Sequence, residues 1–224
     1  MKLLALDTST ENCSVALWLD GEILSRQELA GQRHSDLILP MLEVLLNEAG
    51  IALNSLDGIA FGEGPGSFTG LRIGCGVAQG LALGSDLPVI GICTLLALAA
   101  AAPGDRVLAC LDARIGETYH AAYEKQDGIW HTVCEPSLCY AKDAPDLPGE
   151  GWVGAGSAFA AYAEAMQQRY AGQLLSFDGS VYPQACDMAR LAAPLFERGL
   201  GRDAALAAPL YIRNKVALKT AERK

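Results

Sequence analysis

Long hydrophobic runs are missing from this chain of 224 residues, although 51% of its residues are hydrophobic. The longest apolar run, from Thr94 to about Ala102, is much shorter than the roughly 20 residues that a membrane-spanning helix needs. The first residues place Asp7 and several hydroxyl groups where a signal peptide requires an unbroken apolar stretch. The sequence therefore favours a cytosolic protein with no membrane segment and enough apolar residues to bury a core.

Paired cysteines are also missing. The seven cysteines are scattered along the chain, and no C-x-x-C pair or regular spacing occurs among them. This pattern predicts small, reduced core residues, because disulfide frameworks and zinc sites need cysteines at matched spacings.

Positive charge is scarce: 17 Lys and Arg residues face 26 Asp and Glu residues, which gives a net charge of −9. A nucleic-acid-binding protein needs a basic face for phosphate contacts, so any RNA role of this chain must be shared with a partner. The one basic stretch is the C-terminus, with Arg213, Lys215, Lys219, Arg223 and Lys224. It is typical of a solvated tail, and an RNA contact is the alternative.

Catalytic motifs are absent from the glycine-rich segment GEGPGSFTGLRIGCGVAQG, the strongest local signal. No lysine lies between Lys2 and Lys125, which excludes a phosphate-binding P-loop. Pro65 and Thr69 stand where a nucleophile elbow around Ser67 would need glycine. Thr69 also replaces the third glycine of a dinucleotide fingerprint. Only three histidines are available as bases, so a serine triad is disfavoured.

The chain contains an internal repeat. An apolar strand ending in Asp7, a polar turn, a second strand and an Asp-Gly hairpin signal follow one another in LLALDTSTENCSVALWLDGEI. The same order returns in RVLACLDARIGETYHAAYEKQDGIW, where Asp112 aligns with Asp7 and Asp127-Gly128 with Asp20-Gly21. Chance similarity of two hairpins is the alternative, and the matched aspartates disfavour it.

Helices and strands alternate between the two copies. The sequence predicts a helix that Ser35 caps and Gly50 ends, a strand in LDGIAFGEG, a helix from about Ser67 to Leu83, a strand in PVIGIC, and a helix that stops at Pro103-Gly104. After the second copy it predicts a proline-rich loop over 136–150, a strand in GWVGAG, and helices over 157–170 and 187–198. This alternation favours an α/β protein with a mainly parallel sheet opened by an antiparallel hairpin.

Two lobes that each open with strand, Asp and hairpin resemble the fold of sugar kinases, actin and chaperone ATPases, the ASKHA fold. In that fold the two Asp-bearing turns face a phosphate cleft. The resemblance implies an N-terminal lobe over 1–103 and a C-terminal lobe over 104–204. Periodicity alone establishes only a duplicated α/β protein.

Small residues form two rows on the second predicted helix. Gly70, Gly74, Ala78 and Ala82 follow one another at intervals of four, and so do Gly76, Gly80 and Gly84. Each interior glycine costs about 1 kcal/mol relative to alanine, so close packing must offset the cost. We expect one row to pack on the lobe's own sheet and the other on a partner helix. The turn from Gly64 to Ser67, at a helix N-terminus, could hold an anion.

The motifs LALDTST, RHSDLILP, GPGSFTGLRIG, LDAR and APLYIR together resemble the TsaB (YeaZ) family over nearly the full length. The resemblance implies a non-catalytic subunit that binds and activates TsaD, the enzyme that transfers a threonylcarbamoyl group to N6 of adenosine 37 in tRNA. It implies TsaE, an ATPase, as a second partner, tRNA as an indirect one, and a homodimer when TsaD is absent. It also implies that the segment 205–224 packs back on the first lobe.

The metal-binding histidines of the TsaD family are missing. Its pattern resembles PLIGVNHMEGH, whereas this chain reads PVIGICTLLAL, so Thr94 and Leu98 occupy the two histidine positions. Neither side chain can replace imidazole as a metal ligand. His120 and His131 lie around a hairpin and have no obvious Asp or Cys partners. We therefore expect no metal and no catalytic residues.

Candidate binding residues fall into two sets. Weak candidates for a nucleotide or anion contact are Asp7, Thr8, Gly64, Gly66 and Ser67. We expect no cofactor in the isolated chain and ATP or ADP only at the interface of the complex. Asp7 and Asp112 are either cleft carboxylates that position Mg²⁺ or turn residues inherited with the fold.

The second set forms the expected partner surface on the two helices over 35–49 and 67–83. Its members are His34, Leu37, Ile38, Met41, Leu45, Gly70, Arg72, Ile73, Gly74, Val77, Ala78 and Leu81. Arg72 is interpreted as a cross-interface ion pair or a surface contact. Two other functions stay open, a stand-alone kinase or ATPase of the same fold and a peptidase that cleaves its partner.

Overall fold

The computed structural model describes residues 1–212. The first lobe is built on a five-stranded sheet in which the strands lie in the order β3-β2-β1-β4-β5. Its strands are β1 (Lys2–Asp7), β2 (Asn12–Leu19), β3 (Glu22–Leu29), β4 (Gly58–Gly64) and β5 (Val89–Cys93). β1, β2 and β3 pair antiparallel, whereas β1, β4 and β5 pair parallel. The predicted parallel sheet with an antiparallel hairpin is confirmed.

The second lobe repeats this topology in the order β10-β9-β6-β7-β8. Its strands are β6 (Arg106–Arg114), β7 (Glu117–Gln126), β8 (Ile129–Tyr140), β9 (Trp152–Ala155) and β10 (Leu174–Asp178). β6, β7 and β8 pair antiparallel, and β6, β9 and β10 pair parallel, so each strand has a counterpart in the first sheet. The predicted duplication is confirmed.

The two Asp-Gly signals form the hairpin turns that the sequence predicts. Asp20 and Gly21 have φ values of 52° and 105°, and Asp127 and Gly128 have φ values of 50° and 81°. Backbone of this left-handed kind matches the twist of the flanking strands and favours Asp and Gly. The local sequence therefore determines both hairpins.

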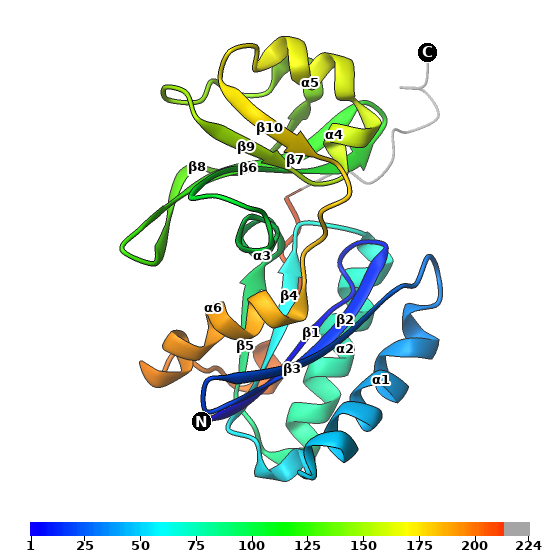
Figure 1. Cartoon of the computed structure of the whole chain (residues 1–224). Coiled ribbons are helices and arrows are strands. Elements are labelled where there is room, and N and C mark those ends of the chain that lie inside the picture. Colours follow the sequence, from blue (N-terminus) through cyan, green and yellow to red (C-terminus); the bar gives the residue numbers. More distant parts are fainter. Residues whose placement is uncertain (213–224) are drawn as a thin grey trace.

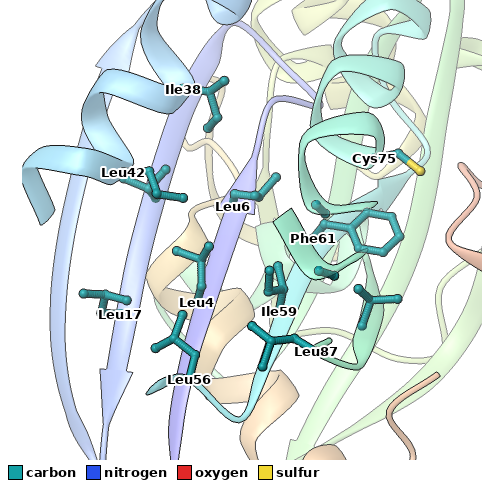
Figure 2. Close-up of a cluster of buried hydrophobic side chains, with 14 of the residues drawn as sticks. Leu4, Leu6, Leu17, Ile38, Leu42, Leu56, Ile59, Phe61, Cys75 and Leu87 are labelled. Atoms are coloured by element: carbon teal, nitrogen blue, oxygen red, sulfur yellow. The ribbon is translucent and has the colours of Figure 1, made fainter. Parts of the chain in front are cut away.

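Two helices, α1 (His34–Ala49) and α2 (Phe68–Ser85), cover the first sheet on one face (Figure 1). The α1 helix begins at His34 and Arg33 precedes it without a side-chain cap, so the prediction that Ser35 caps it is wrong. Gly50 ends α1 in the left-handed conformation, and the Ser67 hydroxyl caps α2 by accepting from the Gly70 N–H. Figure 2 shows Leu4, Leu6, Ile59 and other apolar side chains packed beneath these helices.

Two further helices, α3 (Thr94–Ala101) and α6 (Ala185–Glu197), lie where the lobes meet (Figure 1). The α3 helix follows the first sheet but packs Leu95 and Leu98 on the second. The α6 helix follows the second sheet but packs Met188 and Ala192 on the first. Each of these helices thus packs on the sheet of the other half of the chain. The boundaries at residues 103 and 204 stay predictions.

The second lobe differs locally from the sequence prediction. The predicted loop over 136–150 is wrong in its first part, because β8 continues to Tyr140 and a short 3₁₀ helix follows over Ala141–Asp143. The predicted helix over 157–170 is broken at Tyr162 into α4 (Ala158–Ala161) and α5 (Ala163–Arg169). The edge strand β10 has no counterpart in the prediction.

The chain returns to the first lobe after α6. Arg202 and Val89 exchange backbone hydrogen bonds, and a short 3₁₀ helix over Ala204–Leu206 packs beside α2. The Leu210 N–H donates to the Glu63 carbonyl at 2.6 Å. The predicted basic tail, with the last residue of APLYIR, lies outside the described residues.

All seven cysteines are free thiols, and Cys13, Cys75 and Cys110 are buried. Within residues 1–212, no helix is long and apolar enough to cross a membrane. Another 3₁₀ helix, over Leu53–Ser55, leads into β4.

Candidate functional site

A cleft of about 930 Å³ opens between the lobes, at the carboxyl ends of the central strands. The first lobe contributes the β1–β2 loop with Ser9, the start of α2 with Ser67, and Tyr211 from the C-terminal segment. The second lobe contributes Asp112 and Arg114 at the end of β6. Open α/β sheets commonly bind ligands at this edge, so the cleft is where the fold would carry a site.

Asp7 lies behind the wall of this cleft and is fully buried. Its Oδ1 accepts from the Ser9 N–H at 3.2 Å, and its Oδ2 accepts from the Ser9 hydroxyl at 2.9 Å. A Cβ at Gly62 would lie 2.0 Å from Oδ1 and 3.0 Å from the Met188 methyl group, so both pack against the glycine. Burial raises the pKa of Asp7 to about 7, against the opposing effect of the Ser9 hydrogen bonds.

The glycine-rich turn packs against the β1–β2 loop. The Ser67 N–H donates to the Ser9 carbonyl at 2.7 Å, and the Thr8 hydroxyl donates to the Gly70 carbonyl at 2.7 Å. A Cβ at Gly70 would lie 2.0 Å from the Thr8 carbonyl oxygen. The glycine is therefore needed because two backbones approach closely, which is the packing reason that the sequence left open.

The five predicted nucleotide contacts do not converge on the cleft. Gly66 and Ser67 line it, whereas Asp7 and Thr8 lie buried behind it. Gly64 faces the Leu210 carbonyl, which would lie 2.6 Å from a Cβ there. Because the N–H of Ser67 is already bonded, part of the predicted anion site at the start of α2 is used within the fold.

Asp112, the counterpart of Asp7, does line the cleft. Its Oδ1 accepts from the Tyr162 hydroxyl at 2.6 Å and from the Arg114 N–H at 2.7 Å. The Arg114 guanidinium lies 3.2 Å from its other oxygen and 3.5 Å from Glu11 of the first lobe. These contacts are those of a turn residue that orders the β6–β7 hairpin tip.

Thr94 and Leu98, at the two positions of the missing histidines, are fully buried. The Thr94 hydroxyl has no hydrogen-bond partner among the described residues. In that part of the chain, no group of three His, Cys, Asp or Glu side chains is placed to hold a metal ion.

The three histidines are dispersed. His34 lines the cleft at the start of α1, where its Nε2 donates to the Thr10 carbonyl at 2.8 Å. His120 is buried within the second sheet, near the Ser137 hydroxyl, and burial lowers its pKa. His131 is exposed on β8. A Ser–His pair inside a sheet is closed to a substrate, which disfavours the peptidase hypothesis.

The partner surface predicted on α1 and α2 separates into two groups. Six of its members are buried within this chain, so they do not form an open surface in this structure: His34, Ile38, Leu45, Gly70, Gly74 and Ala78. The others reach the surface in part or fully: Leu37, Met41, Arg72, Ile73, Val77 and Leu81. Helix periodicity identifies an apolar face but does not show that the chain's own sheet covers part of it.

The two small-residue rows of α2 face different environments. Gly70 and Gly74 pack against the Thr8 region, whereas a Cβ at Gly76, Gly80 or Gly84 would meet no atom within 4 Å. The inner row thus lets α2 approach its own sheet. The outer row is exposed, and the fold itself gives no reason for these glycines.

A stack of side chains that the sequence did not reveal lies at the start of α2. The Arg72 guanidinium carbon is 3.8 Å from the centre of the Phe68 ring, and the Phe68 and Tyr211 rings are 5.5 Å apart. The Arg72 Nε donates to the Tyr211 hydroxyl at 3.0 Å. We call Phe68, Arg72 and Tyr211 the aromatic–arginine stack. Arg72 and Tyr211 are 139 positions apart in the sequence, so no local sequence pattern predicts the stack.

The duplicated sheets, the exchanged helices and the interlobe cleft define a two-lobed α/β protein of the ASKHA fold. A family model described as TsaD, tRNA N6-adenosine threonylcarbamoyltransferase, matches residues 21–219.

Closely similar relatives cover almost the whole chain. A TsaB protein of Escherichia coli, named for tRNA threonylcarbamoyladenosine biosynthesis, is 42% identical over 98% of this chain and 97% of its own length. Its namesake in Haemophilus influenzae is 37% identical over 98% and 96%. The solved structure of YeaZ from Pseudomonas aeruginosa, 41% identical, superposes with a TM-score of 0.87, and the match covers 94% of this chain and 99% of that chain. The chain belongs to the TsaB (YeaZ) family.

Proposed function

We propose that this chain is a non-catalytic subunit in the formation of threonylcarbamoyladenosine at position 37 of tRNA. In this proposal it binds and activates a TsaD-type transferase in the cytosol, together with a TsaE-type ATPase, and meets tRNA only within the complex. The proposal is supported by relatives that are named for this biosynthesis. One observation carries it: the side chains at the positions that would act in a catalytic relative are buried in this chain.

Two positions carry that observation. The side chains at the metal-ligand positions, Thr94 and Leu98, are fully buried in the interlobe core. Asp7, which would position a metal–phosphate group in a kinase of this fold, is also buried and packs against Gly62, as Met188 of α6 does. Since catalysis requires groups that touch a substrate, neither position can act without a rearrangement of the core.

The docking surface in this proposal is the outer face of α2 with the adjoining part of α1. Exposed Gly76, Gly80 and Gly84 let another helix approach closely, because no side chain stands between the backbones. Half-buried Leu37, Met41, Ile73, Val77 and Leu81 supply apolar area beside them. The same surface would form the homodimer when the transferase is absent.

The test is threonylcarbamoylation of tRNA by purified TsaD-type and TsaE-type proteins of the same organism, with and without this chain. We expect activity only when this chain is present, and none from this chain alone. Turnover by the chain alone, or equal activity without it, would overturn the proposal and favour the kinase alternative. A separate binding measurement with ATP and ADP should detect nucleotide on the assembled complex and none on the isolated chain.

The contact itself is tested with matched variants of α2. Gly80→Leu adds a bulky side chain to the outer face, where nothing lies within 4 Å, and should abolish the complex while leaving the fold intact. Gln167→Leu on α5 in the second lobe, at an exposed position, is the control for added apolar area. Leucine at Gly74 or Ala78 would test folding instead, because both face the core.

A further inference from the structure

The aromatic–arginine stack holds a cation in place without a carboxylate partner. Of the nine arginines in residues 1–212, six form ion pairs with Asp or Glu side chains there, whereas Arg72, Arg198 and Arg202 form none. Arg72 differs from the other two because two aromatic side chains, Phe68 and Tyr211, hold it in place. The Nε of Arg72 donates to Tyr211, and no residue in the described part of the chain is recorded as a hydrogen-bond partner of its two terminal nitrogens.

Exposed apolar side chains lie next to this cation and next to its partner Tyr211 in the sequence. Phe68, Leu210 and Tyr211 are each between 40% and 43% exposed although all are large and apolar. Exposed aromatic residues around an arginine have the composition of binding hot spots in protein interfaces. Because the stack already restricts the arginine side chain, binding an anion there loses less conformational entropy than binding to a free arginine.

The stack is continuous with the docking surface. Phe68, Arg72, Gly76 and Gly80 follow one another at intervals of one helical turn, and all four are exposed. Tyr211 is placed beside them because the Leu210 N–H bonds to Glu63 at the end of β4. The C-terminal segment over 204–212 therefore forms one border of the outer face of α2.

We propose that Arg72 binds a carboxylate side chain of the transferase subunit, and that Tyr211 positions Arg72 for this contact. The inference rests on the proposed function for the identity of the partner. The guanidinium would donate two parallel hydrogen bonds from its terminal nitrogens, and the apolar rim would exclude water from the pair. The C-terminal segment then takes part in partner recognition through Tyr211.

A carboxylate fits this surface better than an RNA phosphate does. The net charge of −9 repels a polyanion such as RNA. A single carboxylate needs only one cation, and Arg72 supplies it. An RNA-binding surface would need several cations, and the stack supplies one.

The experiment measures the affinity of the chain for the purified transferase by titration calorimetry at low and high salt. The variants are Arg72→Gln, Arg72→Lys, Tyr211→Phe and the double variant Arg72→Gln with Tyr211→Phe. Arg198→Gln is the matched control, because Arg198 is also exposed but lies at the end of α6. Thermal melting of each variant checks that the fold is retained.

We expect Arg72→Gln to weaken binding on the order of 30-fold, the effect of a hot-spot residue, and to reduce its salt dependence. The affinity of Arg72→Lys should lie between those of wild type and Arg72→Gln, because lysine keeps the charge but loses the paired hydrogen bonds. Tyr211→Phe should cost about 5-fold, and the double variant should match Arg72→Gln alone, because Tyr211 acts through Arg72.

Three outcomes would overturn the inference. If the wild-type complex forms and Arg72→Gln binds as tightly as the control, the carboxylate contact is wrong and the proposed function survives. If Arg72→Gln instead lowers binding of the complex to the tRNA anticodon stem-loop, the anion is phosphate. If the unmodified chain does not bind the transferase at all, the proposed function fails and the inference fails with it.

Discussion

The buried carboxyl of Asp7 predicts an unusual pH dependence of stability, which the variant Asp7→Asn isolates. Burial raises the pKa of Asp7 from 3.8 to about 7 in the folded chain. The folded state therefore holds a proton that the unfolded state has lost between these pH values, so stability falls as pH rises through this window. A shift of about three units corresponds to roughly 4 kcal/mol, as an upper value.

Asparagine has nearly the same shape and no charge. It keeps an oxygen that can accept from the Ser9 N–H, but it exchanges an acceptor for a donor near the Ser9 hydroxyl. We expect that exchange to cost about 1 kcal/mol at every pH. Wild type should be slightly more stable at about pH 4, and Asp7→Asn should be more stable by about 3 kcal/mol at about pH 8.

Asp178 provides a matched control, because its Oδ1 accepts from the N–H and the hydroxyl of Ser180 at 2.7 and 2.6 Å, as Asp7 bonds to Ser9. It is exposed, and the Ser180 hydrogen bonds lower its pKa. Above the pKa of the unfolded state, Asp178→Asn should therefore be less stable than wild type, which is opposite to the effect expected for Asp7→Asn. Urea unfolding followed by circular dichroism across this pH range measures both. Parallel pH profiles for wild type and Asp7→Asn, or a less stable Asp7→Asn at about pH 8, would refute the reasoning.

Other expected outcomes concern stability and are measured by thermal melting. Gly70→Ala should destabilise the chain by about 1–3 kcal/mol, because its Cβ would overlap the Thr8 carbonyl. Gly76→Ala should stabilise the isolated chain by up to about 1 kcal/mol, because its Cβ meets nothing and alanine favours helix. A loss of stability there would show that the fold itself needs the glycine. Thr94→Val replaces a buried hydroxyl without a described partner by a methyl group and should stabilise by about 1 kcal/mol. An equal or lower melting temperature would indicate that the hydroxyl is hydrogen-bonded.

The C-terminal half of the second lobe shows where local reasoning fails. The predicted helix over 157–170 is interrupted at Tyr162, whose hydroxyl donates to Asp112 at 2.6 Å. Asp112 lies 50 positions earlier in the chain, so the sequence around Tyr162 does not predict this contact. β8 likewise extends to Tyr140 because it pairs along the length of β7, although its sequence contains Pro136.

The candidate site was predictable only in part. The glycines of GPGSFTGLRIG mark close approaches, and the row that follows them, Gly76, Gly80 and Gly84, faces outward. The pattern could not show that Asp7 is buried behind the cleft wall. Its surroundings come from distant segments, such as α6, whose Met188 packs against Gly62. Nor could it show that Ile38 and Leu45 serve this chain's own core.

The sequence by itself determined the duplicated α/β fold, the two Asp-Gly hairpins and the identity of the side chains, Thr94 and Leu98, in α3. These features depend on local turn chemistry, on strand and helix periodicity and on which side chains are present. Only the tertiary structure decided which helix packs on which sheet, which glycines stay exposed, and that Tyr211 meets Arg72. Contacts between distant segments depend on the whole packing arrangement, and no short stretch of sequence specifies it.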